Sequence, residues 1–394
     1  MVVSNIFIQS KIKSETDRLV LKTIYDAGKI SRAAIARATR LTRPTISTAV
    51  GKLLDEGLVA ELGQVTNGRG KPATLIEVVD NSCCVIGIDI SNREFQGEIF
   101  DVRGRPIISQ SRFVNYDDPA SIFPALLDLI DDLIQEVQVL GIPLLGIGIG
   151  SPGLLNVKDG SIQFAVNLGW HNFPLRQKIE ARYQVPVYVF NDSQAAALGQ
   201  FTFDNPDGAQ NLIVLKVGRG ISAGIILDGK IYSGSHFGAS EIGHLQIVED
   251  GELCQCGNRG CLETVASSLA IVRQVSQLQQ QGLPNQPNEL TTEDVLAAFE
   301  RGNKEIEAII VRAGKYIGIA VASLVGILNI SDIVIAGSLS RFGSTLLNAI
   351  QDEMEKRVLG NLVAQTNLKL SNLGQDIVMK GAASVILHHE LGVI

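Results

Sequence analysis

The alternation of strand and helix patterns from residue 83 onward constrains the fold of this chain more than any other feature. Short apolar runs bounded by turn residues alternate with longer amphipathic stretches, and the series occurs twice. The first round is predicted as strands 85–90, 96–101 and one near Ile107, helix 119–140, strand 144–150, helix 175–183 and strand 187–190. The second round has strands 212–217 and 222–227 around a glycine turn, then helices that end at strand 332–336. Two such rounds predict a duplicated α/β architecture with a ligand site in the cleft between two lobes.

Composition and charge narrow the class of protein. Of 394 residues, 45% are hydrophobic and 19% are charged, so the chain can bury large cores and is neither disordered nor fibrous. The formal net charge of -7, taken alone, argues against a nucleic-acid partner. However, residues 1–80 hold 12 Lys and Arg against 8 Asp and Glu, whereas the rest holds 22 against 33. A basic amino-terminal part therefore precedes an acidic body.

Targeting and membrane signals are weak in this sequence. The first thirteen residues contain no long apolar stretch, and the longest uncharged run, 316–331, is shorter than the roughly 20 residues that span a bilayer. The five cysteines are crowded rather than spread as in a disulfide framework. We expect a cytoplasmic protein with reduced thiols, no membrane insertion, and a buried helix at 316–331.

The basic part is predicted to contain three short helices between residues 15 and 55. The third starts at Thr42, a favourable N-cap residue, with Pro44 in its first turn and an apolar stripe that includes Ile46 and Val50. Tightly joined helices of this length favour a helix-turn-helix, whose second helix lies in the major groove. The exposed polar candidates for contacts with base edges are Arg43, Thr45, Ser47 and Thr48.

A predicted hairpin follows these helices, with strands 58–62 and 73–78. Its tip carries Arg69 and Lys71 among glycines, and such residues can enter a minor groove or rest on phosphates, as the wing of a winged helix does. The alternative is a small helical adaptor whose cations only face solvent. Helices followed by this hairpin favour a winged helix-turn-helix DNA-binding domain over residues 1–80.

One imidazole and three thiols lie close together in the second round: His244, Cys254, Cys256 and Cys261. A Cys3His set suits tetrahedral Zn²⁺. A disulfide between Cys254 and Cys256 would close a very small strained ring. No coordination position is left open for water, so the sequence predicts a structural zinc rather than a hydrolytic one.

Four motifs in residues 82–394 resemble those of the ROK family of repressors, open reading frames and sugar kinases. They are Gly150-Ser151-Pro152-Gly153, Asn191-Asp192 followed by three alanines, Glu241-Ile242-Gly243-His244, and the cysteine segment ending in Cys261-Leu262-Glu263. The resemblance implies a two-lobed actin-like ATPase (ribonuclease H-like) fold over residues 81–394. Together with the winged helix in front of it, it implies the transcriptional-regulator branch of the family.

The resemblance also implies a sugar pocket. The residues that would hold sugar hydroxyls are Asn167, Asn191, Asp192, Glu241, His244 and Glu263. The chemistry fits, because carboxylates accept from vicinal hydroxyls and an asparagine amide both donates and accepts. In a kinase Asp192 would be the general base, whereas in a binding protein it only accepts a hydrogen bond, so its presence does not separate the two classes. No residue is assigned a catalytic role.

The turns that bind phosphate in the kinases depart from the kinase pattern at three places in this chain. Asp89-Ile90-Ser91-Asn92-Arg93 stands where kinases have Asp-x-Gly-Gly-Thr, Gly218-Arg219-Gly220-Ile221-Ser222 replaces Gly-Thr-Gly-Ile-Gly, and Ala336-Gly337 replaces Gly-Gly. Phosphate needs backbone N–H groups at close approach, which side chains obstruct. An arginine itself binds phosphate, so Arg93 and Arg219 do not disprove nucleotide binding. We nevertheless expect ATP and Mg²⁺ binding to be lost.

The sequence therefore predicts a sugar-responsive transcription factor, a repressor of sugar uptake or metabolism genes that binds a DNA operator. Because readout helices usually work in pairs, we expect a homodimer or homotetramer. The alternatives are an ATP-dependent kinase of hexoses or N-acetylhexosamines with a DNA-binding extension, a sugar-sensing activator, and a regulator controlled by a protein partner.

Overall fold

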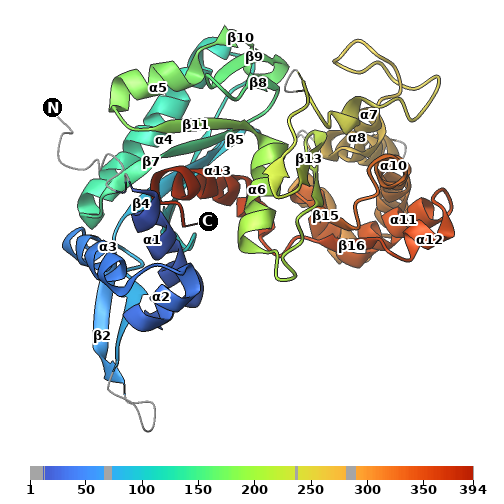
Figure 1. Ribbon diagram of the computed structural model, residues 1–394. Helices are drawn as coiled ribbons and strands as arrows, with labels where there is room; N and C mark the ends of the chain where they lie inside the picture. The colour runs from blue at the N-terminus through green and yellow to red at the C-terminus, as the bar shows by residue number, and fades with distance from the viewer. Residues whose placement is uncertain (1–11, 13, 66–72, 236–237, 281–289, 394) are drawn as a thin grey trace. The chain divides into compact units, whose positions relative to one another are not determined.

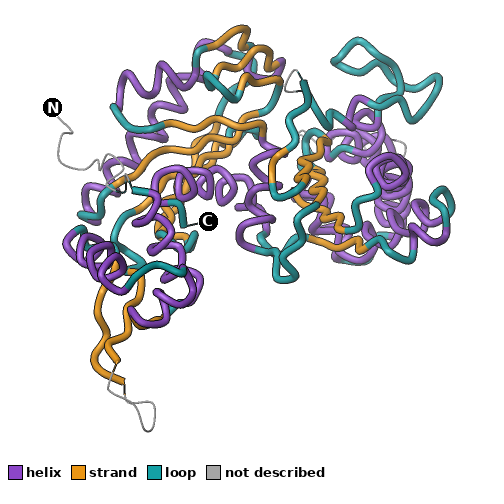
Figure 2. Tube along the Cα trace, in the orientation of Figure 1, coloured by secondary structure: helices purple, strands orange, loops and turns teal. Residues whose placement is uncertain are grey.

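The computed structural model describes residues 12, 14–65, 73–235, 238–280 and 290–393 (Figure 1). The chain forms two compact units, which are described separately. The first unit comprises Met1–Asp192 and Met379–Ile394, and the second comprises Ser193–Val378. Figure 2 shows that both units mix helices and strands, so the predicted α/β class is confirmed.

The first unit begins with a winged helix-turn-helix. Helices α1 (Glu15–Ala27), α2 (Arg32–Thr39) and α3 (Arg43–Asp55) are followed by strands β2 (Val59–Val65) and β3 (Ala73–Val78). A short strand, β1 (Lys29–Ser31), which the sequence analysis did not predict, pairs with β3 and completes a three-stranded sheet. The Thr42 side chain caps α3 by accepting a hydrogen bond from the Thr45 backbone N–H, as predicted.

The rest of the first unit is built on a five-stranded sheet in the order β11-β7-β4-β5-β6. Its strands are β4 (Cys84–Asp89), β5 (Glu94–Asp101), β6 (Pro106–Phe113), β7 (Leu144–Ser151) and β11 (Val187–Asn191). Helix α4 (Pro119–Leu140) buries its apolar face against this sheet, in a core that includes Ile86 and Ile88 of β4. Helix α5 (Leu175–Tyr183) precedes β11. The predicted bounds of α4 and α5 are confirmed.

Two glycines let α13 (Ile377–Ile386) lie directly on the other face of the sheet (Figure 1). A Cβ at Gly87 would overlap the Met379 carbonyl of α13, and one at Gly148 would overlap the Ala382 carbonyl. Gly87 lies between Ile86 and Ile88, and successive side chains of a strand point to opposite faces. The sheet is therefore covered by α4 on one side and by α13 on the other.

A small antiparallel sheet, which was also not predicted, is formed by residues that lie between β7 and α5 in the sequence. It has the order β10-β9-β8 and consists of β8 (Leu154–Asn156), β9 (Ser161–Ala165) and β10 (Trp170–Phe173). Trp170 is buried, and its ring stacks on Phe173 at 4.4 Å between centroids.

The second unit repeats the arrangement with a five-stranded sheet in the order β14-β13-β12-β15-β16. Its strands are β12 (Leu212–Val217), β13 (Ile221–Leu227), β14 (Lys230–Ile231), β15 (Asp332–Ala336) and β16 (Asn367–Leu370). Its helices are α6 (Asp192–Phe203, beginning at the last residue of the first unit), α7 (Leu262–Ala266), α8 (Ser268–Gln280), α9 (Thr292–Glu300), α10 (Lys304–Leu328), α11 (Gly343–Glu355) and α12 (Gly360–Val363).

Helix α10 is the central helix of this unit. It is long and apolar enough to cross a membrane, but 61% of its most apolar window is buried within the protein. Gly314 and Gly318 allow close packing on α11, where an added Cβ would press on Ala349 and on the Ile350 carbonyl. The helix is therefore part of the core, as the sequence predicts for its second half.

Candidate functional site

The four predicted metal ligands of the second unit come together in one cluster. The ligand atoms of His244, Cys254, Cys256 and Cys261 all lie within 4.8 Å of one another. The Cys256 and Cys261 sulfurs are 3.7 Å apart, and the His244 Nδ1 atom is 3.5 Å from the Cys254 sulfur. A tetrahedral zinc with ordinary bond lengths separates two sulfurs by about 3.8 Å and a sulfur from a nitrogen by about 3.5 Å. The donor set and its spacing therefore fit a tetrahedral cation.

Backbone turns fix the positions of these ligands. The Cys254 backbone N–H donates to the Asn258 carbonyl at 2.7 Å, and the Gly257 N–H donates back to the Cys254 carbonyl at 3.0 Å. Gly257 and Gly260 have φ values of 92° and 69°, which glycine adopts without strain. Burial and the neighbouring thiols raise the pKa of Cys261 to about 12. A cation is therefore needed to hold this group as a thiolate at neutral pH.

The residues predicted to bind sugar fall in both units. Asn191 and Asp192, both buried, end β11 and begin α6, and Asn167 lies in the short 3-10 helix between β9 and β10. The Asn191 amide nitrogen donates to the Gly153 carbonyl at 3.0 Å, which ties together two of the family motifs. Glu241, His244 and Glu263, all half-buried, belong to the second unit.

Glu263 lies against the glycine turn 218–221, which joins β12 to β13. Its Oε2 atom accepts a hydrogen bond from the Ile221 backbone N–H at 3.4 Å, and a Cβ on Gly220 would come within 3.0 Å of the same oxygen. The Gly218 N–H donates to the Gly220 carbonyl at 3.0 Å. Two N–H groups of a turn that binds phosphate in similar kinases therefore have acceptors within this chain.

The first turn, between β4 and β5, is also closed by its own side chains. The Asp89 carboxylate accepts a hydrogen bond from the Ser91 backbone N–H at 2.8 Å, and the Asn92 amide reaches the Ser91 hydroxyl at 3.4 Å. The Tyr116 hydroxyl donates to the Asn92 carbonyl at 2.7 Å. The Asp89 carboxylate thus occupies one backbone N–H group of this turn.

The predicted DNA-contacting residues of the recognition helix lie at its start. Arg43, Ser47 and Thr48 are exposed on α3, whereas Thr45 is half-buried, with its hydroxyl 2.8 Å from that of Thr42. Arg69 and Lys71 lie outside the described residues.

In the helix-turn-helix formed by α2 and α3, the cationic side chains that form no ion pair with described residues lie in α2, in the α2–α3 turn and at the start of α3. Lys29, Arg32 and Lys52 form ion pairs with acidic side chains. Arg37, Arg40 and Arg43 are exposed and form no ion pair with any described residue. Arg37 and Arg40 were not among the predicted DNA-contacting residues, because the sequence does not reveal which cations form ion pairs with neighbouring acids.

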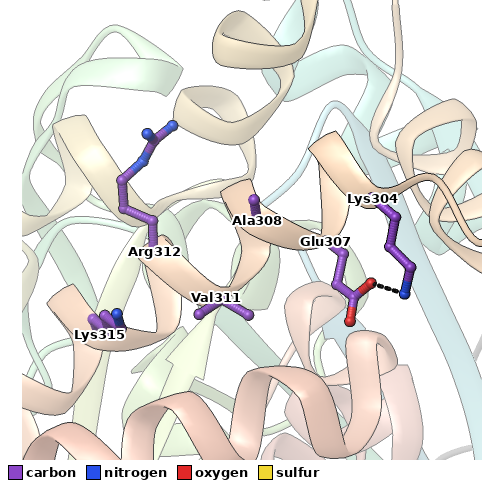
Figure 3. A pocket seen from close by; sticks show the side chains of 6 residues that line it. All are labelled: Lys304, Glu307, Ala308, Val311, Arg312 and Lys315. Carbon is purple, nitrogen blue, oxygen red and sulfur yellow. Dashed lines mark hydrogen bonds and ion pairs between the residues drawn. The ribbon is translucent and has the colours of Figure 1, made fainter.

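A groove of about 490 Å³ runs along the exposed face of α10 (Figure 3). Its lining residues are Lys304, Glu307, Ala308, Val311, Arg312 and Lys315. Lys304 is paired with Glu307 at 2.7 Å, and Arg312 donates to Gln274 at 2.6 Å. None of the predicted site residues lines this groove.

Comparison with known proteins decides the family. The ROK family model matches residues 85–389, and a winged helix-turn-helix DNA-binding model matches residues 13–60. The chain belongs to the ROK family. This ROK chain is 30% identical to the xylose repressor of Caldicellulosiruptor bescii over 95% of its own length and 96% of the relative. The glucokinase of Halalkalibacterium halodurans is 32% identical, but that match covers 77% of the ROK chain and 95% of the enzyme.

The solved structures agree with this assignment. A crystal structure of a ROK family transcriptional regulator, described as a homologue of the E. coli MLC protein, covers 96% of the ROK chain with a TM-score of 0.80 and 26% identity. The match covers 98% of that chain. The predicted family and fold, a winged helix-turn-helix followed by the ROK fold, are therefore confirmed.

Proposed function

We propose that this protein is a sugar-responsive DNA-binding repressor of sugar uptake or metabolism genes. Residues 1–80 form its DNA-binding domain and residues 81–394 its sugar-binding domain. One chain joins a winged helix whose Arg37, Arg40 and Arg43 form no ion pair among the described residues to a ROK body whose phosphate turns are occupied by its own carboxylates. This combination carries the proposal. The xylose repressor matches nearly the whole chain, which supports a regulator.

In this proposal the effector is a sugar, held by Asn167, Asn191, Asp192, Glu241, His244 and Glu263. Sugar binding changes operator affinity only through its different affinities for two conformations of the protein, and couplings of about 1–3 kcal/mol are typical. We propose that the protein acts in the cytoplasm as a homodimer or homotetramer, since paired recognition helices read two half-sites. A direct protein partner is the alternative source of regulation.

We propose that the His244 and cysteine cluster binds one structural zinc. The His244–Cys254 and Cys256–Cys261 separations match tetrahedral ligation, and the four side chains complete the ligand set without a fifth donor. Cys261 is separated from Glu263 by only Leu262, so the metal would fix the start of α7 and with it the Glu263 carboxylate.

We further propose that ATP and Mg²⁺ binding has been lost. The Asp89 and Glu263 carboxylates occupy N–H donors of the two turns, and a second anion at either turn would be repelled. Without a bound nucleotide, Asp192 serves as a hydrogen-bond acceptor for a sugar hydroxyl.

The second candidate function is an ATP-dependent sugar kinase with a DNA-binding extension. The retained Asp192 and the glucokinase match favour it. A coupled assay with hexoses, N-acetylhexosamines and xylose separates the two functions. We expect no phosphate transfer above background; robust transfer that disappears in Asp192→Asn would overturn the loss of ATP binding.

The repressor function is tested with the full-length protein. A DNA duplex is selected from random sequences by binding, and its affinity is then measured with and without D-xylose, D-glucose and N-acetyl-D-glucosamine. We expect one of the sugars both to raise the Tm and to lower the affinity for DNA. Failure to select any duplex would refute DNA binding, and an unchanged affinity with every sugar would refute the proposed effector class.

A further inference from the structure

In the turn between β5 and β6 of the first unit, Arg103 contacts helix α1 of the DNA-binding domain. The Arg103 Nη1 atom donates to the backbone carbonyl of Tyr25, in the last turn of α1, at 2.8 Å. The guanidinium carbon also lies 4.1 Å from the centre of the Tyr25 ring, which is within the range of a cation–π contact. Arg103 and Tyr25 are both half-buried, so this contact is shielded from solvent.

The same arginine also holds the segment that joins the two domains. Its Nε atom donates to the Asp80 carboxylate at 3.1 Å, and the Val102 backbone N–H donates to the Asp80 carbonyl at 3.2 Å. Arg105 pairs with both Asp80 and Asp101. Asp80 lies in the short turn that leads to β4, which the hydrogen bond from the Ser82 N–H to the Val79 carbonyl closes at 2.9 Å.

Backbone hydrogen bonds to Asp101 fix the conformation of the β5–β6 turn and hence the position of Arg103. The buried Asp101 carboxylate accepts hydrogen bonds from the backbone N–H groups of Arg103 and Arg105, at 2.8 and 2.9 Å. An arginine suits the position because its planar group donates along two edges while its face rests on an aromatic ring. A lysine at this position cannot make all three contacts at once.

Resting on the proposed DNA-binding function, we propose that Arg103 is a positioning residue for operator binding, which latches the DNA-binding domain to the first α/β unit through Tyr25 and Asp80. The contact reaches the recognition helix through α1, since Asp17 of α1 pairs with Lys52 of α3 at 3.2 Å. Two half-sites at a fixed separation require two recognition helices at a fixed separation. The latch contributes to that rigidity at a residue remote in sequence from the helix-turn-helix, beside the hydrogen bonds that Arg18 and Lys22 of α1 donate to the His389 and Val393 carbonyls.

Proteolysis tests the latch without DNA. In the full-length protein, an endoproteinase that cleaves before aspartate should cut the Val79–Asp80 bond about tenfold faster in Arg103→Ala than in the wild type, because local opening exposes the segment. Arg103→Lys should be intermediate. Arg112→Ala is the matched control, since Arg112 lies in β6 and pairs with Asp132 of α4. An unchanged rate in Arg103→Ala, or equal acceleration in Arg112→Ala, would overturn the proposal.

DNA binding tests the positioning role. The selected duplex and a version with one half-site destroyed are titrated with each variant. Arg103→Ala should lose about tenfold or more in affinity for the intact duplex while its affinity for the single half-site stays within about twofold. Unchanged affinity for the intact duplex, or equal losses on both duplexes, would overturn the positioning role. If the wild type binds no duplex, the proposed function fails, and the proteolysis experiment still decides the latch.

Discussion

The Glu263 carboxylate oxygen accepts a hydrogen bond from the Ile221 backbone N–H across 42 positions of sequence. Glu263 lies two residues after the proposed metal ligand Cys261, and Ile221 belongs to the turn that holds phosphate in similar kinases. Glu263 is therefore linked to three features. It follows the cysteine cluster in the sequence, it is one of the acids implied in sugar binding, and it hydrogen-bonds to the glycine turn.

Glu263→Gln should weaken sugar binding and leave the metal in place. The amide keeps the side-chain shape but removes the charge that strengthens hydrogen bonds from sugar hydroxyls, so we expect at least a tenfold increase in the Kd of the effector sugar. Thermal shift over a sugar dilution series measures this Kd. Glu252→Gln is the control, since Glu252 is exposed and pairs with Arg273. Equal effects of both substitutions would contradict a direct role for Glu263.

Cys261→Ser should abolish metal binding. Cys261 is fully buried, and a hydroxyl is a poor zinc ligand, so metal content should fall from about one zinc per chain to near zero. Elemental analysis of the purified protein measures it, and Cys83→Ala, at a buried position just before β4, should keep the metal. A wild-type protein that is metal-free, folded and sugar-responsive would refute the zinc assignment.

Arg43→Ala should weaken binding to the selected duplex more than to random DNA, because a contact to a base edge carries about 1–3 kcal/mol of discrimination. Lys71→Ala, in the predicted wing, should weaken both by similar factors and reduce the salt slope by about one unit. Fluorescence anisotropy at several salt concentrations measures both quantities. Identical behaviour of the two variants would remove the assignment of α3 to the major groove.

Gly148→Ala should destabilise the first unit. The added methyl group would overlap the backbone carbonyl of Ala382 in α13, which cannot move without lifting the helix, so we expect a loss of about 1–3 kcal/mol or more in the free energy of unfolding. Urea unfolding measures it. Gly51→Ala is the matched control: a Cβ there meets nothing within 4 Å, and alanine favours the helix by about 0.5–1 kcal/mol.

Acid should destabilise the first unit partly through His389. Partial burial, together with the nearby His388 and Arg18, lowers the pKa of this imidazole from its ordinary value near 6.5. The unfolded chain therefore binds the proton more readily, so the free energy of unfolding is unaffected above about pH 6.5 and falls as the pH drops below it. His389→Phe, which keeps a ring against Tyr188, should flatten this dependence in urea titrations between pH 5 and pH 7.5. A slope identical to that of the wild type would exclude His389 as its source.

Elements with strong end signals could be predicted from the sequence to the residue. Helix α4 runs from Pro119 to Leu140, as expected, because Asp118 caps its start and Gly141 ends it with a φ of 64°. Strand β4 was predicted one residue late, since an uninterrupted apolar run does not mark its own ends. The three residues of β1 and the short strands β8–β10 were missed, because segments this short carry no clear alternation. Strand β1 pairs with the distant β3, and β8, β9 and β10 pair only with one another.

The candidate site was predictable where its residues are close in sequence. The four metal ligands span only 18 positions, and turns alone bring three of them together. The contact of Glu263 with Ile221 and the contact of Arg103 with Tyr25 were not predictable. Both depend on packing between elements that are 42 and 78 residues apart.

The return of the chain to its first unit at Met379 has a consequence for biosynthesis. Residues 193–378 leave the ribosome as a continuous segment and can fold as soon as they emerge. The sheet that follows the DNA-binding domain, by contrast, keeps one face uncovered at Gly87 and Gly148 until α13 is made. A nascent chain that has not yet reached α13 thus carries an exposed apolar sheet, which α13 then covers.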